Sequence, residues 1–136
     1  MATHNKLQQH IEDLYNGVHN FASHQFTVAL TNSSPVATNS VLADITEISY
    51  TNASSRNLVK GSSGQTAGTF THLFNDLTIT ASGGTVGPFR YVVFYNNTPT
   101  SPLDPLIGWY DYGSSITLND TESILIDSTT SNITAS

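Results

Sequence analysis

Residues 89–95, FRYVVFY, constrain the fold of this chain more than any other stretch, because six of the seven are apolar or aromatic. A strand with this pattern needs cover on both faces, as in the middle of a sandwich or at a contact between subunits. Residues 106–112, LIGWYDY, repeat the pattern and contain the only Trp. Pro, Gly and Asn residues separate these runs from the runs that follow, as is typical of turns between strands. This part of the chain therefore predicts closely packed β-strands.

Shorter runs with alternating apolar residues predict further strands. In residues 25–31, Phe26, Val28 and Leu30 share one side, which indicates a half-buried strand. Other strands are expected at residues 69–74, 77–81, 115–118 and 122–127, with a tight turn or a bulge at 75–76. This spacing leaves little room for crossover helices. The 136 residues therefore predict a single, mainly β domain, an antiparallel, jelly-roll-like β-sandwich.

One short N-terminal α-helix is expected at about residues 5–16. Asn5 can cap it, with Gln8 three positions later, and Gly17 supplies a left-handed stop. The apolar stripe of this helix consists of Leu7, Ile11 and Leu14. A helix of three turns is marginal alone, so we expect the stripe to lie against the sheet or against a neighbouring chain.

Three segments carry weaker patterns. Residues 41–50 fit either a short helix at Val41 and Leu42 or a strand through Ile45, Ile48 and Tyr50. Residues 51–68 are rich in Ser, Gly and Asn, so an exposed loop is expected there, and such a loop is a candidate contact with another molecule. Residues 128–136 have little to bury and are expected to form a loose tail.

Composition argues against several classes of partner. Ten acidic and four basic residues give a formal net charge of −6, and no basic patch could neutralise a row of phosphates, so nucleic acid is not an expected partner. The polar N-terminus lacks the apolar core of a signal peptide, and no run approaches the ~20 apolar residues of a membrane span. We therefore expect a soluble protein made in the cytoplasm. Because there is no Cys, stability must come from packing or assembly.

Candidate chemical sites each have a simpler structural interpretation. His4, His10, His19 and His24 fall within the first 24 residues, but their spacings do not place pairs on one helix face, so no metal is expected. No G-x-S-x-G elbow accompanies the many Ser residues. Sequence gives no distance between Asp76 and Asp104 or Asp111, so no carboxylate pair is inferred. We expect no enzymatic activity and no cofactor.

Two further groups could bind a ligand. Asn119, Asp120 and Glu122 bunch oxygen atoms that calcium would accept, although such a bunch is more often turn chemistry between strands. Trp109, Tyr110 and Tyr112 could stack on sugar rings if they are exposed, although aromatic residues at this density more often lie in a core or an interface. A carbohydrate-binding β-sandwich module therefore stays an alternative.

Four segments carry a resemblance to a known family: DLYNGVHNF at 13–21, FTVALTNSSPVATNSVLADITEI at 26–48, TASGGTVGPFRYVVFYNNT at 80–98 and PLIGWYDYGSSITLNDTESI at 105–124. They resemble small virion structural proteins of tailed bacteriophages, most closely capsid cement or decoration proteins. The likeness spans about residues 13–126 and is weak at 51–68. It implies a protein on the capsid surface that binds the major capsid protein. Another virion component, such as a tail, neck or fibre protein, is the second possibility.

The resemblance and the residue patterns together give a set of expected contacts. Core or interface positions are Phe89, Tyr91, Phe94, Ile107, Trp109 and Tyr112, with Gly87-Pro88 setting a turn. Partner-binding positions are Thr3, His4, Asn5, Arg56, Asn57 and Lys60, because free ends and long loops can order on a partner. A homo-oligomer, with a trimer as first choice, is expected because residues 89–95 are apolar on both faces.

Overall fold

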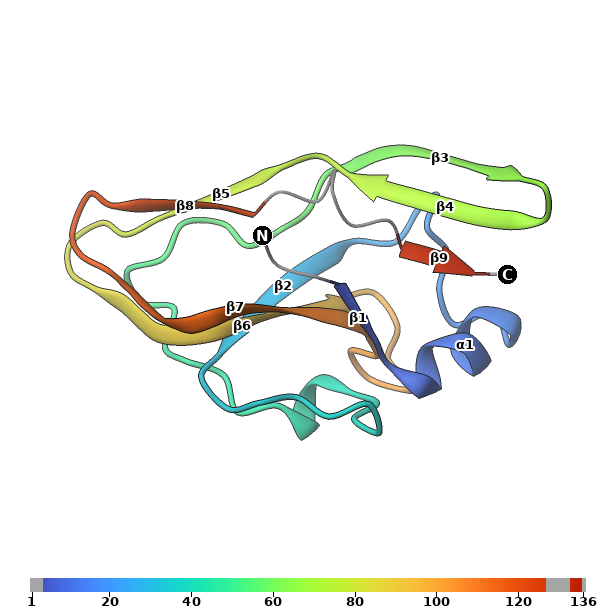
Figure 1. The fold of residues 1–136 in the computed structure, drawn as a ribbon, viewed down its shortest axis with the longest axis horizontal. Helices are drawn as coiled ribbons and strands as arrows, with labels where there is room; N and C mark the ends of the chain where they lie inside the picture. The colour runs from blue at the N-terminus through green and yellow to red at the C-terminus, as the bar shows by residue number, and fades with distance from the viewer. Residues whose placement is uncertain (1–3, 127–132, 136) are drawn as a thin grey trace.

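The computed structural model describes residues 4–126 and 133–135 and consists of two β layers with a short helix at one end (Figure 1). One layer is an antiparallel four-stranded sheet in the order β1-β7-β6-β2. Its strands are β1 (His4–Lys6), β7 (Leu106–Leu118), β6 (Val86–Asn96) and β2 (Phe26–Thr31). The predicted mainly β, antiparallel fold with one short N-terminal α-helix is confirmed.

The second layer consists of two pieces that continue one another (Figure 1). A three-stranded sheet has the order β3-β4-β9, and a two-stranded sheet pairs β5 with β8. Its strands are β3 (Lys60–Thr66), β4 (Thr69–Phe74), β9 (Ile133–Ala135), β5 (Leu77–Thr80) and β8 (Ser123–Ile126). Residues 75–76 do not form the hairpin turn that we considered, because β4 and β5 pair with different strands and not with each other.

The main core lies between these layers. From the four-stranded sheet it receives the side chains of Phe26, Val28, Leu30, Phe89, Val92, Phe94, Ile107 and Tyr110. From the other layer it receives Phe74, Ile79, Ala81 and Ile126. These are the apolar positions of the alternating runs, so their burial explains why the two layers stay together.

The opposite face of β6 is also covered within one chain. Val93 and Tyr95 belong to a second buried cluster with Leu7, Ala29 and Leu106. Leu42, Ile45 and Trp109 pack against this cluster. The apolar pattern of residues 89–95 therefore needs no subunit contact to explain it, although it predicted a doubly covered strand correctly.

β2 is more buried than its alternation predicted. All six of its residues are buried, so the expectation of a half-buried strand is wrong. The segment after η1, a single 3-10 turn at Leu42–Asp44, covers the free edge of β2. Backbone hydrogen bonds join Ile48 to Leu30, Arg56 to Val28 and Leu58 to Phe26. Local alternation cannot reveal cover that comes from a distant loop.

β7 joins two runs that the sequence suggested as separate strands. Residues 115–118 belong to the same strand as residues 106–112, and the register against β6 shifts between the pairs Phe89–Ile116 and Tyr91–Asp111. Gly113, with φ of 86°, lies in this irregularity. Gly87-Pro88 was expected in a turn but lies inside β6, at another register shift.

The helix is shorter than predicted. α1 comprises Gln8–Tyr15, and its N-cap is Leu7, which has no side-chain capping bond. Asn5 does not cap it because residues 4–6 form β1, which pairs with β7. Leu7 is fully buried in the second cluster, so tertiary packing outweighs the local capping pattern here.

Two other expectations need correction. Residues 51–68 are not all loop, because residues 60–66 form β3, although the side chains of residues 62–68 are exposed as expected. In the tail, residues 133–135 form β9 and pair with β4, so this part is not loose, and residues 128–132 and 136 lie outside the described residues. β3 is polar and β9 is only three residues long, so neither strand shows a hydrophobic period in the sequence.

Candidate functional site

An open depression lies on the side of the molecule that carries η1. We call it the η1 depression. Its volume is about 370 Å³, and it is lined by Val41, Leu42, Ala43, Ile45, Glu47, Leu103 and Asp104. Leu103 is 62% exposed, which is unusual for a leucine, and Leu42 and Ile45 are half-buried. The lining is therefore mostly apolar yet accessible.

Two loops that are distant in sequence build this depression. The backbone N–H of Leu42 donates to the carbonyl of Asp104 at 2.9 Å, and that of Leu106 donates to the carbonyl of Ser40 at 3.0 Å. A β-bridge joins Val41 to Pro105. Below the surface, Leu42 and Ile45 rest on the second buried cluster. The depression is thus fixed by the fold rather than formed by free loops.

The carboxylates of Asp44, Glu47 and Asp104 lie in or beside the η1 depression, and the first two accept hydrogen bonds from within the chain. Oδ2 of Asp44 accepts hydrogen bonds from the backbone N–H groups of Ser40 and Val41, and these bonds lower the pKa of Asp44. Oε1 of Glu47 accepts a 2.7 Å hydrogen bond from the hydroxyl of Tyr50. These contacts hold the loop in shape.

Asp104 is different because no hydrogen bond from the described residues reaches its carboxylate. Its backbone adopts a left-handed conformation with φ of 49°, which Asp and Asn tolerate better than most residues. Partial burial raises the pKa of its carboxyl group. No Lys or Arg is among the residues that line the depression. Among the described residues, no ion pair therefore neutralises its charge at the edge of the apolar hollow.

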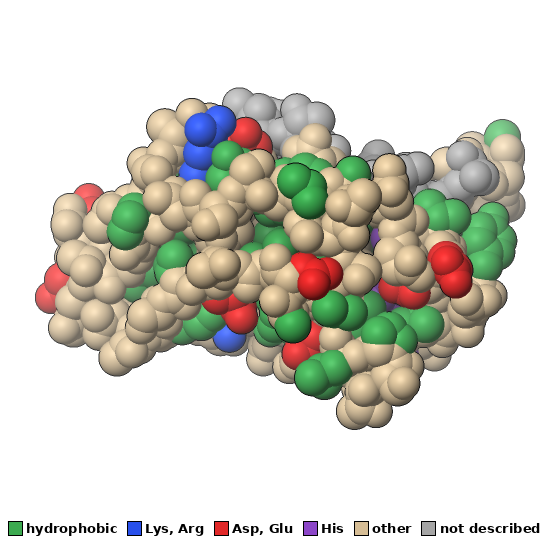
Figure 2. All heavy atoms as spheres, turned by 90° about the horizontal axis from the view of Figure 1, so that it is seen from below, with side chains coloured by type: hydrophobic (Ala, Val, Ile, Leu, Met, Phe, Trp, Pro, Cys, Tyr) green, Lys and Arg blue, Asp and Glu red, His purple; other side chains and the backbone are tan. Residues whose placement is uncertain are grey.

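Figure 2 looks onto this side of the molecule and shows hydrophobic side chains and acidic side chains close together, with few basic ones. Most of the remaining visible face consists of backbone and of side chains that are neither hydrophobic nor charged. This agrees with the composition, in which Asp and Glu outnumber Lys and Arg by ten to four. The face is therefore suited to a partner that brings apolar groups and positive charge.

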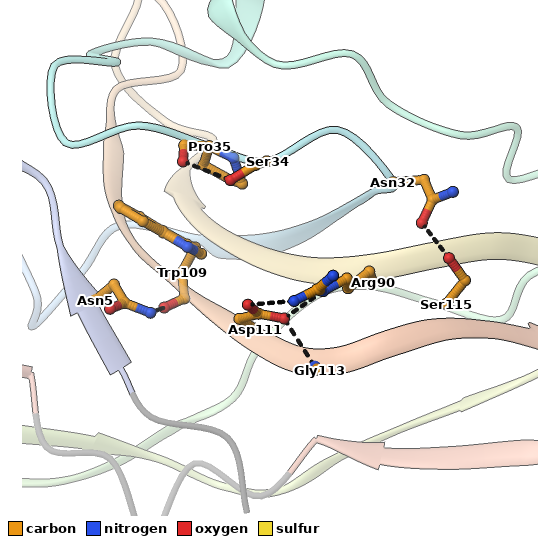
Figure 3. Close-up of polar contacts among 9 residues, drawn as sticks. All are labelled: Asn5, Asn32, Ser34, Pro35, Arg90, Trp109, Asp111, Gly113 and Ser115. Carbon is orange, nitrogen blue, oxygen red and sulfur yellow. Dashed lines mark hydrogen bonds and ion pairs between the residues drawn. The ribbon is translucent and has the colours of Figure 1, made fainter.

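The predicted N-terminal contact residues lie on the edge of the four-stranded sheet. Thr3 lies outside the described residues, and His4 is opposite Tyr110 in the ladder between β1 and β7. The side-chain amide of Asn5 donates to the carbonyl of Trp109 at 3.3 Å (Figure 3). This segment is therefore built into the sheet at residues 4–6 rather than free.

The other three predicted contact residues make bonds within the chain. Nη1 of Arg56 donates to the carbonyl of Val28 at 2.7 Å, and its guanidinium lies 3.6 Å from the centre of the Tyr50 ring. Oδ1 of Asn57 accepts from the hydroxyl of Thr27, and Nζ of Lys60 donates to the carbonyl of Ala22 at 2.7 Å. These contacts tie residues 56–60 to β2 and to the segment that follows α1.

The six expected core or interface residues divide into two groups. Phe89, Tyr91, Phe94 and Ile107 are buried. Trp109 and Tyr112 are half-buried and pack against the second and the main cluster, respectively. Near them, Arg90 and Asp111 form an ion pair with distances of 2.7 and 3.1 Å (Figure 3). Tyr110 is only 2% exposed, so the three aromatic residues do not form one exposed sugar-stacking surface.

A buried group of histidine and phenylalanine rings connects the N-terminal part of the chain to both layers. The ring centres of His10 and His19 are 5.2 Å apart. Phe21 stacks on Phe26 at 4.7 Å and lies 4.8 Å from His72 of β4. Their sequence spacing gave no sign of this, because the chain turns back after α1. These rings are a packing unit that contains three buried imidazoles.

Two of these imidazoles, His19 and His72, favour their neutral form. The side-chain amide of Asn96 donates to Nδ1 of His19 at 3.1 Å and to Nδ1 of His24 at 2.8 Å. Burial, together with the charge of His24, lowers the pKa of His19 to about 4. Burial and the charge of Lys60 lower the pKa of His72. His19 and His72 are therefore uncharged at neutral pH.

The described residues hold no group of three or more His, Cys, Asp or Glu side chains placed to bind a metal. In the turn at residues 119–122, Oε1 of Glu122 accepts from the backbone N–H of Asn119, and Oδ1 of Asp120 accepts from that of Gly83. These oxygens thus serve the turn. Within residues 4–126 and 133–135, no helix is long and apolar enough to cross a membrane.

No family model matches the chain, and no characterised protein or solved structure is significantly similar to it. The site therefore has to be read from its own geometry. Apart from Asp104, which was weighed as a carboxylate partner of Asp76, no residue of the η1 depression was expected in a site. Two signals pointed to these residues: residues 41–50 carry apolar residues without a regular period, and Leu103 is a lone leucine between Pro102 and Asp104 in a turn-rich segment.

Proposed function

We propose that this protein is a non-enzymatic structural protein of a tailed-bacteriophage particle. In this proposal it binds the outer surface of the head as a cement or decoration protein and reinforces contacts between major capsid subunits. The observation that carries the proposal is the η1 depression, because two segments of the family resemblance meet there. VLADITEI supplies Val41 to Glu47. A β-bridge joins Val41 to Pro105, the first residue of PLIGWYDYGSSITLNDTESI, and Leu103 and Asp104 come directly before that segment.

The other segments of the resemblance make up the scaffold behind this surface. FTVALT forms β2, and the run after Gly87 together with LIGWYDY forms the centre of the four-stranded sheet. Packing in the core explains why the buried residues of these segments are apolar. Packing does not explain the apolar residues of VLADITEI in the same way, since the side chain of Ala43 is exposed and Val41 and Ile45 are only half-buried. Accessible apolar residues of this kind are typical of a surface that binds a partner, and this supports the proposal.

A small, weakly charged protein suits this role. Cement proteins gain avidity when several copies bind neighbouring subunits at the same time. We keep a homo-oligomer, with a trimer as first choice, as part of the proposal, because symmetric copies bind several capsid subunits together. The apolar run at residues 89–95 no longer supports it, since both faces of that run are covered within the chain. The contact that we expected from sequence, through the residues before Leu7 and through residues 51–68, is a separate possibility. The internal bonds of Arg56, Asn57 and Lys60 leave those side chains less available for it.

The proposal can be tested by adding purified protein to isolated heads that lack it and, separately, to isolated tails. We expect saturable co-sedimentation with heads and a higher temperature of head disruption, because each bound copy stabilises the assembled lattice by mass action. A heat-denatured sample of the protein is the control for nonspecific adsorption. Binding to tails alone, or no binding to either part, would contradict the proposal.

A further inference from the structure

We propose that the η1 depression receives a segment of the capsid subunit in which an apolar side chain stands next to a Lys or Arg. The apolar side chain enters the hollow formed by Val41, Leu42, Ile45 and Leu103, and the cation lies against Asp104. This inference rests on the proposed function and names the chemistry of the contact that it requires.

The apolar half of the contact follows from the shape and lining of the depression. At about 370 Å³ it is at the small end of the range for ligand sites, and it is open rather than enclosed. An enclosed cavity would suit a small molecule, whereas an open hollow suits a side chain carried on a partner surface. Leu103, 62% exposed, would lose most of its contact with water in such a complex.

The expectation of a Lys or Arg on the partner follows from the hydrogen bonds that the nearby carboxylates already accept. Asp44 is held by the backbone at Ser40 and Val41, and Glu47 is held by Tyr50, with Nη1 of Arg56 at 3.9 Å. Asp104 alone has no hydrogen bond from the described residues to its carboxylate. An ion pair at the edge of an apolar contact fixes the orientation of the partner and accelerates its approach. A Lys or Arg therefore complements this position, and a carboxylate or phosphate does not.

The shape of the η1 depression is preformed in the folded chain. The bonds from Leu42 to Asp104 and from Leu106 to Ser40 join its two loops, and the second buried cluster supports its floor. A partner would consequently meet a surface that needs little ordering, which favours affinity for a contact of this small size.

The decisive experiment measures binding of variants to heads that lack the protein. Leu103→Asp places a charge in the hollow, and Asp104→Asn removes the charge while keeping a residue that tolerates the left-handed backbone. Leu125→Asp and Glu12→Gln are matched controls, because Leu125 is 54% exposed on β8 and Glu12 is exposed on α1. Circular dichroism and thermal unfolding verify that each variant is folded.

We expect Leu103→Asp to weaken head binding about tenfold or more and Asp104→Asn to weaken it about fivefold, as for residues at the centre of an interface. The affinity of the wild-type protein should fall as salt rises, and that of Asp104→Asn should fall less. The two controls should bind like wild type. If wild type binds heads but both variants bind equally well, the inference is overturned and the proposed function survives. If wild type does not bind heads, the proposed function fails and the inference fails with it.

Discussion

Gly87 occupies a place in β6 where no side chain fits. Its φ is 119°, and a Cβ built on it would lie 2.6 Å from the carbonyl oxygen of Ile116 on β7. Real Cβ atoms do not approach a backbone oxygen so closely, and this φ is strained for any residue with a side chain. Gly87 is therefore required by the close approach of two strands and not by a turn.

The first prediction concerns the substitution Gly87→Ala. We expect it to lower the free energy of unfolding by about 2 to 4 kcal/mol, because backbone strain and overpacking act together. Urea unfolding followed by circular dichroism measures this change. Gly64→Ala is the control, since a Cβ at Gly64 would meet nothing within 4 Å, and its effect should stay within about 0.5 kcal/mol. Equal stability of the two variants would contradict the strand placement of Gly87.

Residue types alone could identify much of the core. Phe89, Phe94 and Ile107 were expected to be buried and are. Sequence could not show that Arg56 and Lys60 would bond to Val28 and Ala22, because these carbonyl groups become neighbours only after the chain has folded. A cation in a polar segment looks the same in sequence whether it is free or internally bound.

At the scale of elements, the buried ring group joins α1 and the segment after it to β2 and β4. His19 contacts Phe26, and His72 lies between Phe21 and Phe74 with ring centres 4.8 and 4.7 Å away. In the described residues, Nε2 of His19 and both ring nitrogens of His72 are buried without a hydrogen-bond partner. Charging either ring would place an unsolvated cation in this contact.

The second prediction is a loss of stability in mild acid. The folded-state pKa of His19 is lowered to about 4 from 6.5, so the unfolded chain takes up a proton first as pH falls. The stabilising contribution is complete above pH 6.5 and is lost as pH falls from 6.5 towards 4. We expect the free energy of unfolding to be about 1 to 2 kcal/mol lower at pH 5.0 than at pH 7.5. His72, whose pKa is also lowered, adds to this loss.

The variant His72→Phe tests the origin of that loss. Its neighbours are phenylalanine rings, so the replacement removes two buried nitrogens and one titrating group. The difference in unfolding free energy between pH 7.5 and pH 5.0 should become smaller, whatever the absolute stability of the variant. Asp13, whose pKa is raised by burial, titrates in the opposite sense and cannot produce the loss. A wild-type protein equally stable at both pH values would contradict the prediction.

Elements with a clear hydrophobic period could be predicted, and elements held by tertiary contacts could not. Residues 69–74 and 77–80 form the strands that alternation indicated. β1 and β9 are three residues long and are defined by their partners β7 and β4, so no local signal predicts them. The helix begins later than predicted for the same reason, because Asn5 pairs with Trp109 in the sheet and cannot cap α1.

At the scale of the whole molecule, the two layers leave one side for other contacts. Residues 32–58 follow β2 along that side (Figure 1). They cover the edge of β2 and supply five of the residues that line the η1 depression. The number of layers could be predicted from the density of strands, since each apolar face needs a partner. The depression could not, because it joins residues 41–47 to residues 103–104, and only the folded chain brings them together.

The most direct test of the account is a reconstruction of the parent particle at side-chain resolution. We expect density for this two-layered fold on the outer surface of the head, with the η1 side facing a capsid subunit and an apolar and a basic side chain of that subunit at Leu103 and Asp104. Density for the protein only in the tail would contradict the proposed function. Density on the head with the η1 side turned to solvent would contradict the docking surface.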